Sequence, residues 1–263
     1  MPSNPRAVLT RPAAPPDATV RYGEHPDQIA DVRLPADPTD PAGPLVVVIH
    51  GGVWRAEYGR EHTGPLAAAL AAHGYAVAQL EYRRTGQPGG GWPGTFADVA
   101  TGVAALPALV SAAGGRPRTG PPILLGHSAG AHLALWCAAD APSLVGGVLA
   151  LAPVADLTEA YRLDLDGGAV RALLGGGPHD VPDRYAIADP IRRVSAKTQA
   201  VVVHGILDEQ VPVGMSRGYA EAAEEAGGDV RLLELPDCEH FGLIDPLTPA
   251  WPHVLAALRS LHN

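Results

Sequence analysis

Ser128 has the sequence surroundings of a nucleophile. It stands at the centre of Gly126-His127-Ser128-Ala129-Gly130, with a short apolar run at 121–125 before it and a helix-forming run at 131–139 after it. This order predicts a sharp strand-to-helix turn with the hydroxyl at its tip, next to helix N–H groups that favour a developing negative charge. The same five-residue pattern also occurs in plain tight turns of glycine-rich chains, and this chain contains 31 glycines. The strand before it and the helix after it favour the nucleophile.

A serine nucleophile needs a general base, and His240 is the candidate among eleven histidines. It lies in the polar run 237–242, which follows the last predicted strand. That position should bring it to the sheet edge that carries Ser128, because ligand sites in open α/β sheets gather at the carboxyl ends of the strands. The alternative is a histidine of an ordinary surface loop.

The acid that orients such a histidine should lie between the serine and the histidine in the chain. Asp208 follows the penultimate predicted strand and is favoured over its neighbour Glu209 and over Asp156, which follows the preceding strand. From that position a carboxylate would accept the Nδ1–H of the histidine, fix its tautomer and stabilise the imidazolium. Ser128, Asp208 and His240 are therefore the predicted catalytic triad.

An oxyanion hole is predicted where His50-Gly51-Gly52-Val53-Trp54 follows the continuous apolar run 45–49. Residues with little side chain let backbone N–H groups approach a substrate oxygen, and acyl transfer needs two or three such donors. The candidates are the amides of Gly52 and Val53, completed by that of Ala129. The alternative is an ordinary Gly-Gly turn at the end of a strand.

The few aromatic residues fall on segments that should surround this site. Trp54, Tyr58, Tyr82, Trp92 and Phe241 are the candidates for its rim, and they favour a flat leaving group. The alternative is that Trp54 and Tyr82 only fill space beneath loops.

Neither a metal nor a cofactor is predicted. Glu239-His240 is an isolated pair, and His127 and His132 do not have the spacing that places two ligands on one helix face. Cys137 and Cys238 are expected to be passive small residues.

The elements that must position these residues alternate between strand and helix patterns, which predicts a single α/β domain over 1–263 with a mostly parallel sheet covered by helices on both faces. Residues 1–18 are predicted to be a loose arm, and 19–34 an edge hairpin. The broken pattern at about 154–198 predicts a small cap over the sheet, since it is too short for a core of its own. The remaining strands are expected at 45–49, 75–82, 121–125, 145–152, 200–204 and 230–235, and the main helices at 63–73, 95–113, 131–139, 216–226 and 249–262.

Composition and net charge limit the binding partners and the cellular compartment that are expected. The net charge of −9 argues against nucleic acid and anionic membranes. Two cysteines form no disulfide framework, and neither a signal peptide nor a membrane-spanning run is recognised. A cytoplasmic protein is expected, with its oligomeric state open and a homodimer among the options.

The motifs together resemble those of the α/β-hydrolase superfamily. They are the His50–Trp54 run, the run from Gly126 to Ala134, His204-Gly205…Asp208…Val211-Pro212, and His240. The H-G-G-x-W form is similar to that of kynurenine-formamidase-like esterases, and the resemblance covers the chain from Leu45 onward. One departure is Ala188-Asp189-Pro190, where such esterases often show Ser-Pro; it bears on the cap.

The resemblance implies a cofactor-free serine hydrolase of small acyl esters or amides that works through an acyl-enzyme. Carboxylesterase and arylformamidase activity, the latter on substrates such as N-formylkynurenine, are expected first. The alternatives are an acetyl or feruloyl sugar-ester esterase and a non-catalytic binding protein on the same fold.

Overall fold

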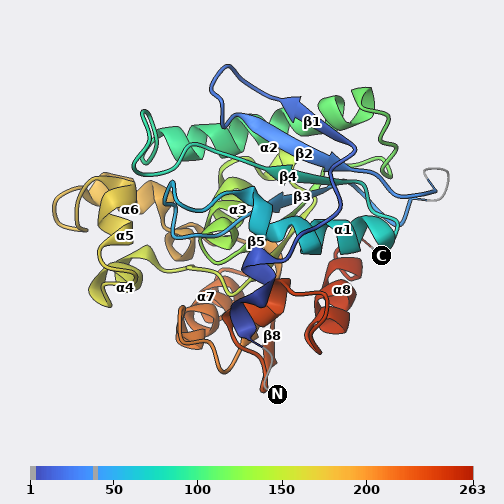
Figure 1. The fold of residues 1–263 in the computed structure, drawn as a ribbon. Helices are drawn as coiled ribbons and strands as arrows, with labels where there is room; N and C mark the ends of the chain where they lie inside the picture. The colour runs from blue at the N-terminus through green and yellow to red at the C-terminus, as the bar shows by residue number, and fades with distance from the viewer. Residues whose placement is uncertain (1–3, 38–40, 263) are drawn as a thin grey trace.

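The computed structural model describes residues 4–37 and 41–262, which build an eight-stranded sheet flanked by helices (Figure 1). The strands lie in the order β1-β2-β4-β3-β5-β6-β7-β8. Neighbours from β4 across to β8 are parallel, whereas β1 and β2 pair antiparallel at one edge. The predicted edge hairpin and the mostly parallel sheet are confirmed. The bounds are β1 (Ala18–Arg21), β2 (Ile29–Arg33), β3 (Val46–Ile49), β4 (Val77–Leu80), β5 (Ile123–His127), β6 (Gly147–Leu151), β7 (Gln199–Gly205) and β8 (Asp229–Leu235).

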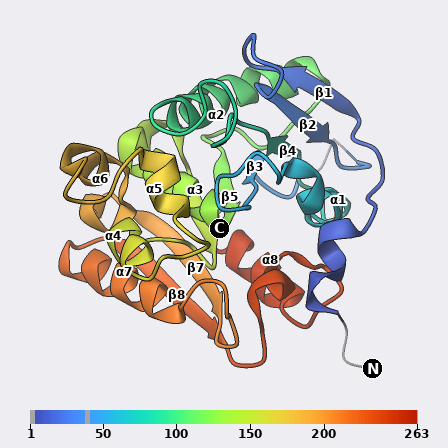
Figure 2. The ribbon, with the colours of Figure 1, turned by 60° about the vertical axis from the view of Figure 1, so that its left-hand side comes forward.

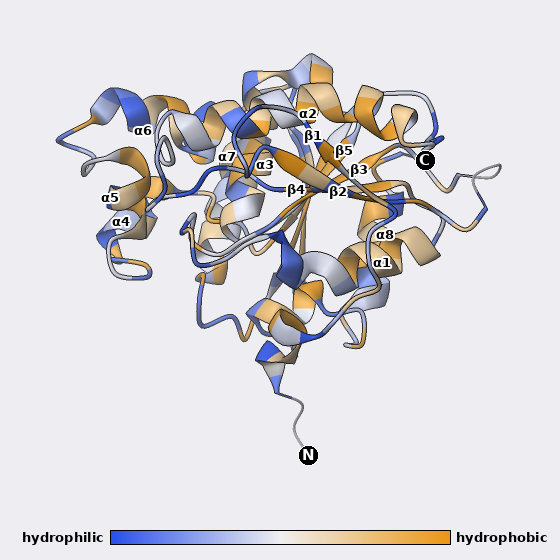
Figure 3. Ribbon diagram, turned by 45° about the horizontal axis from the view of Figure 1, so that its top comes forward, coloured by the Kyte–Doolittle hydropathy of each residue, from blue (hydrophilic) through white to orange (hydrophobic). Residues whose placement is uncertain are grey.

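Helices cover both faces of the sheet, as predicted (Figure 2). Strand β3 shows why helices are needed on both faces. All four of its side chains are buried, and they alternate between two hydrophobic cores. Val47 and Ile49 pack toward one group of helices, and Val46 and Val48 toward the other. The central strands are accordingly hydrophobic along their length, while the helices are mixed (Figure 3). The first group is α2 (Gly94–Ala112), α3 (Ala129–Asp140) and α7 (Val213–Glu225), and the second is α1 (Gly64–Ala72) and α8 (Trp251–Arg259).

The segment between β6 and β7, predicted as a cap, consists of short helices. They are α4 (Leu157–Arg162), α5 (Ala169–Leu174), α6 (Pro182–Ala188) and the 3-10 helix η4 (Pro190–Arg193). Buried Asp189 lies between α6 and η4 and connects them to α4. Its carboxylate accepts hydrogen bonds from the backbone N–H groups of Leu157 and Thr158, at the start of α4, at 2.8 and 3.3 Å. Residues of α4 and α5 lie over the carboxyl end of the sheet and line the cavity described below.

The described part of the N-terminal arm is packed against the protein, so the prediction of a loose arm is wrong for residues 4–18. A 3-10 helix, η1 (Pro5–Thr10), buries Val8 completely in the core that also contains α1 and α8. Arg11 forms a two-point ion pair with Asp245, with Nη2 2.8 Å from Oδ2. The arm therefore lies beside the turn that carries His240, the 3-10 helix η5 (His240–Ile244).

Helix α2 is the one helix in residues 4–37 and 41–262 whose length and hydropathy match a membrane span. In the structure it packs against the sheet through buried Phe96, Val99, Val103 and Leu106. Its apolar character is therefore used in the protein core.

Candidate active site

Ser128 forms the turn between β5 and α3, as predicted. Its backbone has φ 55° and ψ −120°, a conformation that is uncommon for a residue with a Cβ and that marks strain at a functional turn. The turn also needs glycine on both sides, because a Cβ on Gly126 would lie 2.4 Å from Ala131 Cα and one on Gly130 would lie 2.1 Å from Ile49 O. The Ser128 side chain reaches a cavity at the carboxyl end of the sheet.

His240 and Asp208 form a close pair beside Ser128. His240 Nδ1 lies 2.6 Å from Asp208 Oδ2, and since a carboxylate can only accept, Nδ1 carries the proton. That tautomer leaves Nε2 with a free lone pair. His240 lines the same cavity as Ser128, so the structure brings together the three residues predicted from sequence.

Asp208 is held as an anion by several donors. Its other oxygen, Oδ1, accepts from the backbone N–H groups of Gln210 and Val211, both at 2.8 Å. Burial alone would raise the pKa of Asp208, but hydrogen bonds from His204 and His240 outweigh it and lower that pKa well below its usual range. The carboxylate therefore stays charged where an imidazolium would form.

His204 is a further residue of the site, with no role predicted for it from the sequence. It is fully buried, and its Nε2 lies 3.2 Å from Asp208 Oδ2 and 3.0 Å from Val211 O. Because both of those groups accept, Nε2 carries the proton and Nδ1 accepts from Ser216 Oγ at 2.7 Å. The signal in the sequence was its place at the end of a buried strand, four residues before the aspartate.

The predicted oxyanion loop passes directly over the serine turn. A Cβ on Gly51 would lie 3.2 Å from Ser128 Cβ, so the two backbones are in close contact. Val53 and Trp54 have positive φ values of 47° and 58°, a conformation that costs of the order of 1–3 kcal/mol per residue and has to be held by its surroundings. Ala129 opens helix α3, so its N–H is one of those that no intrahelical carbonyl accepts.

Trp54 anchors one end of this loop. Its indole Nε1–H donates to His132 Nδ1 at 3.1 Å, and His132 Nε2–H donates to Ala188 O at 3.0 Å. Its carbonyl accepts from the Thr85 backbone N–H and hydroxyl at 2.8 and 2.9 Å. These bonds tie the loop to helix α3, to the end of α6 and to the loop after β4.

His50 anchors the other end of the loop. Its Nδ1 lies 2.8 Å from Gly51 O and its Nε2 lies 2.8 Å from Glu81 Oε1. Burial would raise the pKa of Glu81, but its interactions with His50 and Arg84 outweigh burial and lower that pKa to about 2. The charged Glu81 carboxylate therefore fixes the position of the His50 ring.

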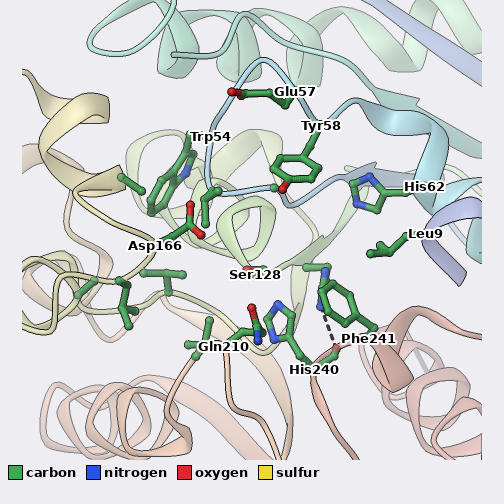
Figure 4. A pocket seen from close by; sticks show the side chains of 18 of the residues that line it. Leu9, Trp54, Glu57, Tyr58, His62, Ser128, Asp166, Gln210, His240 and Phe241 are labelled. Atoms are coloured by element: carbon green, nitrogen blue, oxygen red, sulfur yellow. Dashed lines mark hydrogen bonds between the residues drawn. The ribbon is translucent and has the colours of Figure 1, made fainter. Parts of the chain in front are cut away.

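The cavity above Ser128 has a volume of about 660 Å³, within the usual range of small-molecule sites. Ser128 lies near its centre, with Phe241 and His240 on one side and Trp54 and Asp166 on the other (Figure 4). Its apolar walls come from the arm, the oxyanion loop, the segment around α4 and α5, and the loop after β8; they include Leu9, Val53, Trp54, Tyr58, Val154, Leu163, Leu165, Val170, Val211 and Phe241.

Two of the five aromatic residues predicted to surround the site do not reach this cavity. Tyr82 is fully buried, stacks on His50 at 4.5 Å between ring centroids, and donates its hydroxyl to His50 O at 2.8 Å. Trp92 packs edge-on against Phe96 at 5.0 Å and belongs to the core beside α2. Both are structural, so the prediction is wrong for them. Trp54, Tyr58 and Phe241 line the cavity, as predicted.

Other histidines near the cavity are held neutral. Burial lowers the pKa of His62 to about 4 and that of His132 to about 4. Burial, together with the neighbouring His240, lowers the pKa of His127 far below its usual range; His127 Nε2–H donates to His240 O at 3.0 Å. Across residues 4–37 and 41–262, three or more His, Cys, Asp or Glu side chains nowhere meet in a metal-binding group.

Comparison with known proteins agrees with the fold. Residues 30–222 match the BD-FAE family model. The chain is 30% identical over 217 residues to esterase LipQ of Mycobacterium tuberculosis, covering 75% of this chain and 50% of that protein. It is 27% identical to a probable isoprenylcysteine alpha-carbonyl methylesterase of Oryza sativa subsp. japonica, covering 87% of this chain and 59% of that protein. It is 26% identical to the kynurenine formamidase of Danio rerio, covering 87% of this chain and 75% of that protein.

Among solved structures, a truncated carbohydrate esterase from gut microbiota superposes with a TM-score of 0.80 at 18% identity, covering 95% of this chain and 99% of that one. The native esterase 2 of Thermogutta terrifontis superposes with a TM-score of 0.73 at 21% identity, covering 97% and 95%. The chain spans about half to three-fifths of the length of the first curated relatives. The matched family model extends over most of the chain, from strand β2 into helix α7, and the chain belongs to the BD-FAE family and has the α/β-hydrolase fold.

Proposed function

We propose that the protein is a serine esterase in which Ser128 is the nucleophile, His240 the base and Asp208 the orienting acid. The observation that most strongly supports this proposal is the 2.6 Å contact between His240 Nδ1 and Asp208 Oδ2, beside the cavity that Ser128 and His240 line. It fixes the tautomer whose Nε2 can take a proton from the serine hydroxyl. Membership of a family whose relatives include named esterases supports the same reaction.

In the proposed reaction, Ser128 Oγ attacks the acyl carbon while His240 Nε2 takes its proton. The charged Asp208 stabilises the imidazolium, and the N–H groups of Gly52, Val53 and Ala129 stabilise the oxyanion. His240 then gives the proton to the leaving group, and an acyl-enzyme remains. A water that His240 activates releases the acid and restores the serine.

The proposed substrates are short acyl esters of aryl alcohols and aryl formamides. A β-branched Val53 in the oxyanion loop narrows the space beside the reacting carbon, and each methylene that does not fit changes discrimination by on the order of 1–3 kcal/mol. The Danio rerio kynurenine formamidase and the esterases among the relatives support the formamide and ester options respectively.

The nucleophile is tested by labelling with a fluorophosphonate and mapping the modified peptide. We expect one adduct, on Ser128, and none in Ser128→Ala, whose fold should be intact because a single hydroxyl contributes little to stability. An adduct that persists in the variant or maps elsewhere contradicts the assignment. A protein that takes no label at all would be a binding protein.

The substrate class is tested by kcat/KM for N-formylkynurenine, for p-nitrophenyl acetate, butyrate, octanoate and palmitate, and for acetylated and feruloylated sugars. We expect the short aryl esters to exceed octanoate and palmitate. Reaction with short esters but not with N-formylkynurenine would make the protein a carboxylesterase without formamidase activity. Faster reaction with the sugar esters would favour that alternative.

A further inference from the structure

The N-terminal arm forms part of the cavity wall. Arg6 and Leu9 of η1 line the cavity, and the Arg6 guanidinium carbon lies 5.3 Å from the centre of the Phe241 ring. The arm is held in place by buried Val8 and by the ion pair of Arg11 with Asp245, which caps the turn that begins at His240. It is thus anchored to the same element as the proposed base.

The position of His240 determines which side of Ser128 receives the leaving group. In acyl transfer by a serine hydrolase, the histidine that takes the serine proton passes it to the leaving group, so the leaving group must contact Nε2. Phe241 follows His240 directly, and the two rings meet edge-on with 5.0 Å between centroids. In Figure 4, Leu9 and His62 lie with Phe241 on this side, whereas Trp54 and Asp166 lie across Ser128. The leaving-group side of the cavity is therefore the side closed by the arm.

We propose that Arg6 and Leu9, with Phe241, form the leaving-group subsite, and that it takes an aryl alcohol or aryl amine, including one with an anionic substituent. The ring of the leaving group would contact Phe241 and Leu9. Arg6 offers a positive charge in the cavity wall. Of the acidic residues in that wall, Glu61 pairs with Arg60 at 3.5 Å and Asp166 pairs with Arg55 at 3.1 Å. This inference rests on the proposed function, and it assigns a binding role to a segment outside the motifs of the family.

The order of bond changes gives the subsite a distinctive kinetic signature. During acylation the Ser128 Oγ–acyl bond forms, the bond from the acyl carbon to the leaving oxygen or nitrogen breaks, and the serine proton reaches that atom through His240. The leaving group then departs. During deacylation a water supplies the hydroxyl of the acid, and its other proton returns to Ser128 Oγ through His240. A residue that contacts only the leaving group therefore affects acylation and not deacylation.

The test is stopped-flow measurement of acylation and deacylation rate constants for phenyl, 1-naphthyl, 3-carboxyphenyl and ethyl acetates, which share one acyl group. We expect Leu9→Ala to slow acylation by phenyl acetate roughly two- to tenfold, the size of a lost contact with an aromatic ring. Acylation by ethyl acetate and the common deacylation step should not change. Leu144→Ala, at an exposed leucine of the 3-10 helix η3 (Pro142–Leu144) and outside the cavity, is the matched control.

Two further variants separate the contributions of Leu9 and Arg6. Leu9→Phe, which keeps an apolar wall but narrows it, should lower the ratio of 1-naphthyl to phenyl acetate acylation. Arg6→Gln should lower the ratio of 3-carboxyphenyl to phenyl acetate acylation about two- to fivefold at low salt, and the difference should vanish at about 1 M salt.

The inference is overturned if Leu9→Ala slows aryl and ethyl acetates equally, if it alters deacylation, or if all arm variants match Leu144→Ala. Each of these results leaves the proposed function intact, because the acyl-enzyme still forms on Ser128. Failure of the wild-type protein to form an acyl-enzyme overturns the proposed function itself, and the subsite with it.

Discussion

His204 Nε2 lies 3.2 Å from Asp208 Oδ2, the same oxygen that accepts the hydrogen bond of His240. One carboxylate oxygen is therefore shared between two histidines. One of them is buried behind it and fixed by Ser216 and Val211, and the other faces the cavity. In the proposed mechanism, His204 positions the acid and reduces the charge that it presents to the base.

His204→Leu should lower kcat, and His204→Gln, which keeps an N–H donor, should lower it less. In the leucine variant the Asp208 charge is no longer shared, so it stabilises the His240 imidazolium more strongly. The acid limb of kcat/KM should therefore move to higher pH. If His204 had only a structural role, its replacement would reduce kcat without moving the acid limb of kcat/KM. A pH–rate profile of both variants distinguishes a structural role from an electrostatic one.

Asp208→Asn should lower kcat by about 10⁴, the size of the effect when the orienting acid of a serine protease is replaced, because the amide no longer favours the productive tautomer. The matched control is Asp156→Asn. Asp156 caps helix α4 by accepting from the Glu159 N–H at 2.8 Å, and asparagine caps a helix equally well. A larger loss of kcat in Asp156→Asn than in Asp208→Asn would identify Asp156 as the orienting acid.

Activity should rise with pH through a single histidine ionisation, because only neutral His240 can accept the serine proton. The pKa of His62, lowered to about 4 by burial, keeps that ring neutral above pH 5. His62→Gln should therefore leave the acid limb of kcat/KM where it is. Movement of the limb in this variant would show that His62 titrates with the reaction.

Trp54→Phe should lower both stability and kcat. The variant keeps an aromatic ring but removes the donor to His132 Nδ1, leaving a buried nitrogen unpaired at a cost of about 1–3 kcal/mol. It also frees one end of a loop whose positive φ values need support. Urea unfolding and kcat measure the two effects, and Trp92→Phe, outside the cavity, is the control. Equal changes in both variants would contradict an anchoring role for Trp54.

Asp189→Asn should gain stability relative to the wild type as pH rises from 4 to 7. Burial raises the pKa of Asp189 to about 6, so the folded state favours the protonated acid. The resulting stability is present below about pH 4 and is lost as pH rises through about 6, for a total of about 2–3 kcal/mol. Asparagine has no such ionisation. Urea unfolding at pH 4.5 and 7 measures the difference, and a pH-independent difference would mean that Asp189 is already ionised at pH 4.5.

The proximity of Ser128, Asp208 and His240, the proposed triad, could be predicted because each stands at a strand end with a local pattern. Gly126 and Gly130 mark the serine turn, and Asp208 and His240 follow the last two strands. The parallel sheet then brings these ends to one edge, so the order of elements was enough to place them together.

The incorrect or missing predictions concern the orientation of side chains and contacts between residues far apart in the chain. Tyr82 stands at the expected strand end, but its ring faces inward onto His50, and the chain pattern does not specify this orientation. The arm has no periodic pattern, and it is held by Asp245, more than two hundred residues away. The role of His204 was not predicted, because it comes from two partners further along the chain, Ser216 and Asp208.

The contact between His50 and Gly51 has a consequence for the loop above Ser128. Since His50 Nδ1 lies 2.8 Å from Gly51 O, the buried ring restrains the planar peptide between Gly51 and Gly52, and with it the direction of the Gly52 N–H. Stabilisation of an oxyanion is most effective when the dipoles are already aligned before charge develops. In the proposed mechanism, the His50 ring, held by Glu81, therefore makes the direction of this dipole a property of the folded protein, already set before any substrate arrives.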